Sequence, residues 1–124
     1  MSTLDLPLAP SVNALWRANR GRVHRSARYV AWQKEAGWEL LRQKPKRLAG
    51  KVLISIAAGR PDKRRRDVDN LVKPLPDLLV AHQVIEDDAG VAAVDVRWDE
   101  LVPKGRVCLE VKRQGERREP RALI

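Results

Sequence analysis

Apolar residues recur along this chain with two different periods, and each period predicts an element. Residues 4–8 alternate apolar and other side chains, which is typical of a short strand, and Pro7 suits only the edge of a sheet. Residues 10–13 have the composition of a turn. Residues 16–25 are basic and have no apolar period, so we expect an irregular loop there.

A helical period follows this loop. Ser26 is a candidate N-cap for a helix that we expect to run to about residue 44, just ahead of a proline. Val30, Gly37 and Leu41 fall near one stripe of that helix, so they are predicted to form its buried face.

The second half of the chain predicts three strands and one more helix. The β-branched run over 51–57 is the clearest strand. Alternating apolar residues predict strands over 91–98 and 106–112, joined by a hairpin connection at 102–105. Leucines at helical spacing predict a helix from 71 to about 83.

The start of this second helix is irregular in sequence. Asp69 or Asn70 is a candidate cap. Pro76 lacks an amide donor and is expected to disturb the first turn. The expected buried face consists of four leucines and a histidine: Leu71, Leu75, Leu78, Leu79 and His82.

These elements follow the order β-α-β-α-β-β. The order predicts an α+β fold, in which two helices pack on one side of a small mixed sheet. The length suits a single domain, expected over 1–113. The polar residues 114–124 have no apolar period, and we expect a disordered basic tail there.

Composition narrows the function classes. Lys and Arg total 25 against 16 acidic residues, a net charge of +9, which favours a polyanionic partner, and more often nucleic acid than an anionic membrane. The sequence contains neither an apolar run of about 18 residues nor a signal-peptide pattern, so we expect a cytoplasmic protein without a membrane partner. The single Cys108, expected to pack within a strand, excludes an intrachain disulfide, and two histidines make a zinc site improbable.

The strongest chemical signal is a basic and acidic motif that follows the 51–57 strand. Three arginines, Arg64, Arg65 and Arg66, run directly into Asp67 and Asp69, and Lys73 follows. A second acidic pair, Asp87 and Asp88, comes after the predicted helix. Carboxylates suit Mg²⁺, and cations suit phosphate. A cluster of Asp67, Asp69 and Asp88 beside Lys73 would suit metal-dependent cleavage of a nucleic-acid backbone, with one metal ion or two.

Simpler interpretations of these residues stay open. Asp67 and Asp69 are also suited to a solvated loop and an N-cap, and Lys73 to an ion pair with Asp69. Asp87 and Asp88 are also typical of a turn before a strand. Asp77 is expected to have a structural role, in which it holds Lys73.

The complete motif is specific enough to indicate a family. The run 67–73, then Asp77, then 86–88, resembles the signature of the RusA family of Holliday junction resolvases, as do the segments 6–13 and 19–22 and the three arginines before Asp67. The resemblance covers residues 4 to 112. Pro76 departs from the family pattern, and Leu78 stands near a position where a junction-opening wedge can occur.

The resemblance implies a homodimeric, Mg²⁺-dependent endonuclease that resolves four-way DNA junctions by paired symmetric nicks, from a bacterium, phage or prophage. It implies catalytic roles for Asp67, Asp69, Asp88 and Lys73, with Asp87 as a further metal-binding residue. Six arginines are expected to contact DNA: Arg17, Arg20, Arg22, Arg64, Arg65 and Arg66. The alternatives are a non-catalytic DNA-binding protein on the same fold, a metal nuclease for other branched DNA, and an RNA-binding module, which the low aromatic content disfavours.

Overall fold

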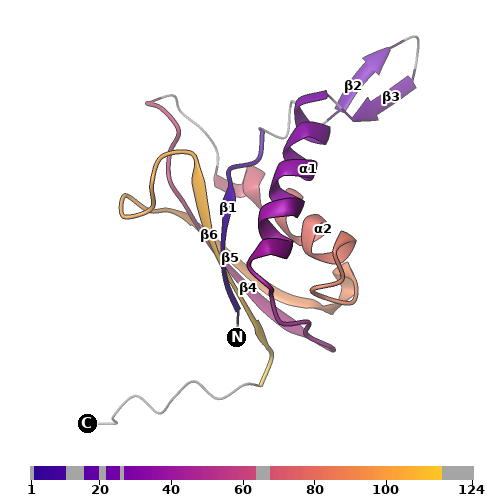
Figure 1. The fold of residues 1–124 in the computed structure, drawn as a ribbon, viewed down its shortest axis with the longest axis vertical. Helices are drawn as coiled ribbons and strands as arrows, with labels where there is room; N and C mark the ends of the chain where they lie inside the picture. Colours follow the sequence, from indigo (N-terminus) through magenta and orange to yellow (C-terminus); the bar gives the residue numbers. More distant parts are fainter. Residues whose placement is uncertain (1, 11–15, 20–21, 26, 64–67, 116–124) are drawn as a thin grey trace.

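A four-stranded mixed sheet, covered on one face by two helices, forms the body of the protein (Figure 1). The computed structural model describes residues 2–10, 16–19, 22–25, 27–63 and 68–115. The strands lie in the order β1-β6-β4-β5, in which β4 and β5 are parallel and the other pairs are antiparallel. The sheet and helices are β1 (Ser2–Pro7), α1 (Ala27–Arg42), β4 (Val52–Ala58), α2 (Pro74–Ala81), β5 (Val91–Trp98) and β6 (Arg106–Arg113). The predicted α+β fold is confirmed.

The core lies between the sheet and the helices. Alternate residues of the two central strands are buried, which explains the period of two in the sequence. Pro7 lies at the end of the edge strand β1, as predicted. The fully buried side chains of the sheet include Leu4, Leu6, Val52, Ile54, Ile56, Val107, Leu109 and Val111. By contrast Cys108, on the opposite face of β6, is exposed, so the expectation that it would be packed was wrong.

The buried face of α1 differs from the predicted one. Tyr29, Trp32 and Leu40 face the core, whereas Val30 and Leu41 are 38 % and 52 % exposed. Gly37 is buried, as expected. The two aromatic rings stack with centroids 5.6 Å apart, and they bring more apolar area to the sheet than the predicted stripe would.

The predicted hairpin between the last two strands was wrong. Strand β4 lies between β5 and β6 and pairs with both of them. Five of its seven residues are buried, which is the property of a central strand. The connection from β5 to β6 therefore passes over the end of β4, where the Asp99 amide donates to the Ala58 carbonyl at 2.8 Å and the Gly105 amide donates to Gly59 at 3.1 Å.

The basic segment 16–25 is not the irregular loop that we expected. It contains a separate antiparallel hairpin, β2 (Trp16–Asn19) and β3 (Arg22–Arg25), which projects beyond the start of α1 in Figure 1. Gly21, between the two paired segments, was the sequence signal for a hairpin, because glycine is favoured in two-residue hairpin loops.

The prolines displace the start of the second helix rather than break it. A 3₁₀ turn, η2 (Val68–Leu71), precedes α2, which begins at Pro74 instead of residue 71. Both Pro74 and Pro76 fall in the first turn, where backbone amides have no intrahelical acceptor in any case. The predicted leucines are all buried, and His82 caps the helix end, half-buried against α1 at Gly37. Within the described ranges, no helix is long and apolar enough to span a bilayer.

Candidate nucleic-acid and metal site

The first acidic segment forms a turn whose apolar residues pack inward and whose acidic residue faces solvent. In η2, Leu71 is buried and Val68 is half-buried, and the turn contacts β5. This anchoring leaves the carboxylate of Asp69, between the two apolar residues, exposed to solvent. Asp69 is therefore presented on a short rigid turn at the amino-terminal side of α2, where an oxygen ligand is accessible.

Lys73 follows this turn and forms an ion pair with a residue later in the chain, not with Asp69. Its Nζ is 3.6 Å from Oδ2 of Asp77, an i, i+4 ion pair. The alternative in which Lys73 pairs with Asp69 is replaced by this contact, and the structural role expected for Asp77 is confirmed. The Lys73 side chain is 64 % exposed, so the pair adds little stability and its ammonium group remains accessible to a ligand.

The second acidic segment forms the turn that leads into β5. Oδ1 of Asp87 accepts a hydrogen bond from the Gly90 amide at 2.9 Å, and the 3₁₀ turn η3 (Asp88–Gly90) follows. Just before this segment, Ile85 forms a parallel β-bridge with Leu48, in the connection between α1 and β4. The turn role considered for Asp87 is therefore present, and one of its two carboxylate oxygens already has a partner.

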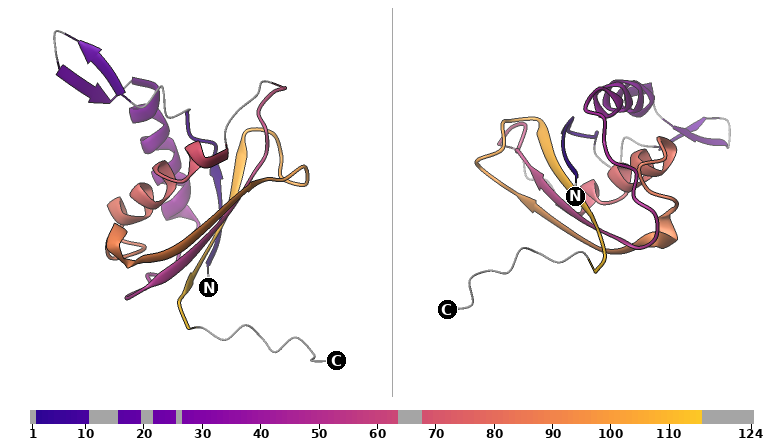
Figure 2. Two further views of the ribbon diagram at one scale, coloured as in Figure 1. Left: turned by 180° about the vertical axis from the view of Figure 1, so that it is seen from behind. Right: turned by 60° about the horizontal axis from the view of Figure 1, so that its bottom comes forward.

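The two acidic segments lie at opposite ends of α2. Figures 1 and 2 agree in showing η2 at the amino-terminal end of this helix and the segment around residues 84–90 beyond its other end. Among the side chains that the structure describes, no group of three acidic, histidine or cysteine residues could hold a metal ion.

Several predicted site residues lie outside the described residues. These are Asp67, Arg20, Arg64, Arg65 and Arg66, and the turn predicted at 10–13 falls mostly there as well. For Arg17, Arg22 and Asp88 the backbone alone is described: the two arginines are on β2 and β3, where Arg17 pairs with His24 and Arg22 with Asn19, and Asp88 begins η3. Leu78, near the position where a junction-opening wedge can occur, is only 2 % exposed and belongs to the core, so it does not face a ligand.

A network of ion pairs around Arg106 lies away from this motif. Arg106 of β6 donates from Nη2 to Oε1 of Glu39 on α1 at 2.8 Å and from Nε to Oδ1 of Asp5 on β1 at 3.2 Å. The hydrogen bond from Arg106 holds the pKa of Glu39 below its usual value, against the opposing effect of burial. The same hydrogen bond raises the pKa of Arg106. This network holds α1 to the sheet, and no periodic pattern along the chain predicts it.

Comparison with known proteins indicates the same family as the acidic motif. The family model described as Endodeoxyribonuclease RusA matches residues 5–112. The crossover junction endodeoxyribonuclease RusA of Escherichia coli K12 is 35 % identical over 120 residues, which cover 91 % of this chain and 95 % of that protein. The protein of the same name from enterobacteria phage HK97 is 32 % identical over 108 residues, which cover 86 % of this chain and 89 % of that protein. The one from enterobacteria phage 82 is 35 % identical over 114 residues, which cover 90 % of this chain and 94 % of that protein. The chain belongs to the RusA family of endodeoxyribonucleases.

Proposed function

We propose that this protein is a Mg²⁺-dependent, structure-selective endodeoxyribonuclease that resolves Holliday junctions by paired symmetric nicks during DNA recombination and repair. The observation that carries the proposal is the agreement between family and motif. Relatives named crossover junction endodeoxyribonucleases match about nine tenths of the chain. The chain also has the acidic and basic residues that phosphodiester cleavage needs.

Exposed carboxylates before and after α2 suit this chemistry. Asp69, before the helix, offers hard oxygen ligands, and Asp87, after it, keeps one carboxylate oxygen without a hydrogen bond to Gly90. We assign Asp67, Asp69 and Asp88, with Asp87, to metal binding. When bound, Mg²⁺ supplies positive charge at the scissile phosphate and lowers the pKa of a coordinated water. The ammonium group of Lys73 can leave its exposed pair with Asp77 and stabilise negative charge that develops on the phosphate.

The remaining assignments concern DNA and assembly. The net charge of +9 suits a polyanionic substrate, and we assign phosphate contacts to Arg17, Arg20, Arg22 and 64–66. A two-fold homodimer would place one site on each of two opposed strands of a four-way junction, which is what symmetric nicking requires. We propose one domain over 1–113, a disordered tail over 114–124, and action in the cytoplasm of a bacterium, with a chromosomal, phage or prophage gene.

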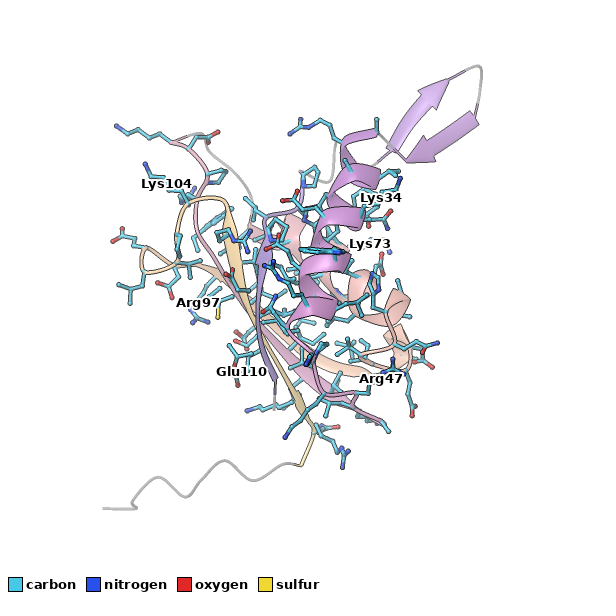
Figure 3. All side chains as sticks on the ribbon, in the orientation of Figure 1. Lys34, Arg47, Lys73, Arg97, Lys104 and Glu110 are labelled. Carbon is cyan, nitrogen blue, oxygen red and sulfur yellow. The ribbon has the colours of Figure 1, made fainter. Side chains whose placement is uncertain are left out.

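Cleavage of a labelled synthetic four-way junction tests the proposal. Wild-type protein with Mg²⁺ is expected to make paired nicks in the junction, with no cutting in EDTA and none of linear duplex. Asp69→Asn and Lys73→Ala are expected to lose at least a hundredfold in rate while they still bind the junction, because each removes one charged group and leaves the fold intact. Glu110→Gln, which removes a carboxylate on β6 far from α2, is the control and is expected to cleave normally (Figure 3).

Four results would contradict parts of the proposal. Tight junction binding without cutting in any divalent metal would indicate a binding protein on a nuclease fold. Equal cutting of flaps or duplex ends would indicate a different branched substrate. Full activity of Asp69→Asn would remove that residue from the metal site. Sedimentation at 14.1 kDa, rather than about twice that mass, would contradict the dimer.

A further inference from the structure

A cavity of about 470 Å³ opens beyond the ends of the two parallel strands, outside the residues assigned to catalysis. Its size is within the range of small-molecule sites, and it lies where sheets with parallel strands commonly bind ligands, beyond their carboxyl ends. Both strand ends contribute to it, together with the connection from β5 to β6. The lining residues are Arg60, Trp98, Asp99, Glu100, Val102 and Lys104.

Trp98 provides the flat apolar wall of this cavity. It is the last residue of β5, and it is half-buried because part of its ring packs against the core while part lines the cavity. The guanidinium of Arg60 lies over the ring, 4.8 Å from its centroid. Arg60 itself is exposed. Contacts of this kind are weak at exposed positions, so a planar ligand can displace the guanidinium or stack with it.

The charged groups around the ring define the ligand further. Arg60, Lys63 and Lys104 are exposed cations on the two connections that meet at this end of the sheet, where Figure 3 shows Lys104. The carboxylate of Asp99 is already engaged, because Oδ1 accepts from the Leu101 amide at 2.9 Å and Oδ2 lies 3.6 Å from Arg97. Glu100 also lines the cavity and is exposed, so the lining carries both signs of charge. The exposed cations Arg60 and Lys104 beside an aromatic wall suit a group that combines a flat ring with a phosphate.

We infer that this cavity, the Trp98 cavity, binds one unstacked nucleobase of the branched DNA, stacked on Trp98, with Arg60 and Lys104 toward its phosphate. The inference rests on the proposed function, since a branch point supplies bases that are cheaper to unstack than those of continuous duplex. It also fits the position of the candidate site: η2, which presents Asp69, packs on β5, the strand that ends in Trp98. The cavity thus serves to position the substrate and has no part in the chemical step.

The chain offers a matched control for Trp98. Trp38 on α1 is 64 % exposed, and Arg42 lies over its ring at 4.9 Å, nearly the distance found between Arg60 and Trp98. Trp38 does not line the Trp98 cavity, so it has the same kind of arginine contact outside that cavity. A substitution of Trp38 therefore reports the effect of removing a tryptophan that stacks with arginine, and only a substitution of Trp98 also removes the wall of the cavity.

The experiment measures DNA binding in EDTA, with 2-aminopurine placed beside the branch point of a four-way junction. Trp98→Leu is expected to bind the junction roughly tenfold more weakly, the scale of one base–aromatic stack, and to lose the change in 2-aminopurine fluorescence. Trp98→Phe should stay within about twofold of wild type because a ring remains. Trp38→Leu should match wild type, and duplex binding should change little in all variants.

A second variant covers the case in which Trp98→Leu fails to fold. Val102→Trp fills the cavity from the loop side and leaves Trp98 in the core, so it should weaken junction binding similarly. Wild-type binding by a folded Trp98→Leu or Val102→Trp protein would overturn the inference, as would equal losses on junction and duplex. Binding of a single-stranded oligonucleotide is measured alongside. Ring-dependent binding there, without junction cleavage by wild type in Mg²⁺, would support the cavity while contradicting the proposed function.

Discussion

The ion pair between Arg106 and Glu39 should make a measurable, pH-dependent contribution to stability. The two side chains are 29 % and 18 % exposed, and the guanidinium reaches both carboxylate oxygens, at 2.8 and 3.5 Å. Glu39→Gln keeps the shape and can still accept one hydrogen bond from the Arg106 guanidinium, but it removes the negative charge and one of the two accepting oxygens. Loss of the attraction between opposite charges in this partly exposed pair should lower the free energy of unfolding by about 1 kcal/mol at pH 7.

The direction of the pH effect follows from the lowered pKa of Glu39. A carboxyl group whose pKa is lower in the folded than in the unfolded state stabilises the fold above its unfolded value of 4.5. That stabilisation is lost as the pH falls through the folded-state pKa. The difference between wild type and Glu39→Gln should therefore be full at pH 7, begin to shrink below about pH 4.5 and nearly vanish at still lower pH.

Urea unfolding followed by circular dichroism measures this difference. Both proteins are compared at one concentration, because a dimer would make the transition concentration-dependent. Glu35→Gln, an exposed carboxylate on the same helix, is the control and should change stability by less than about 0.5 kcal/mol. A loss in Glu39→Gln that is the same at pH 7 and pH 3, or no loss at pH 7, would refute the charge-based reasoning.

Four further substitutions test the packing, each measured by thermal or urea unfolding. Gly59→Ala should destabilise by roughly 1–3 kcal/mol, because a Cβ there would meet backbone carbonyl oxygens of the β5–β6 connection that cannot rotate away; an unchanged melting temperature would show that this connection is not closely packed. Leu79→Ala, at a fully buried position on α2, should cost about 2–5 kcal/mol, whereas Leu41→Ala on the exposed side of α1 should cost less than about 1 kcal/mol. Trp32→Phe should cost roughly 1–3 kcal/mol, because it removes the donor of the buried 2.9 Å hydrogen bond from Nε1 to the Pro7 carbonyl, and equal stability would mean that water replaces the donor.

Much of the local structure follows from the sequence alone. The strand over 91–98 has its predicted limits, and those near 51–57 and 106–112 differ by one residue, because alternation of buried and exposed side chains is a property of the strand itself. The spacing of carboxylates and Lys73 likewise indicated the family, since a motif is a property of the order of residues. The exposed positions of Asp69 and Lys73 agree with that interpretation.

Only the tertiary structure decided which of several locally equivalent arrangements is formed. Both sides of α1 offered an apolar stripe, and the side that stacks Tyr29 on Trp32 covers the sheet. The last two strands would have suited a hairpin, yet β4 lies between them, and its backbone pairs with β5 on one edge and with β6 on the other. The tertiary structure also brings Arg60 over Trp98, a contact between residues too distant in sequence for any local period to predict.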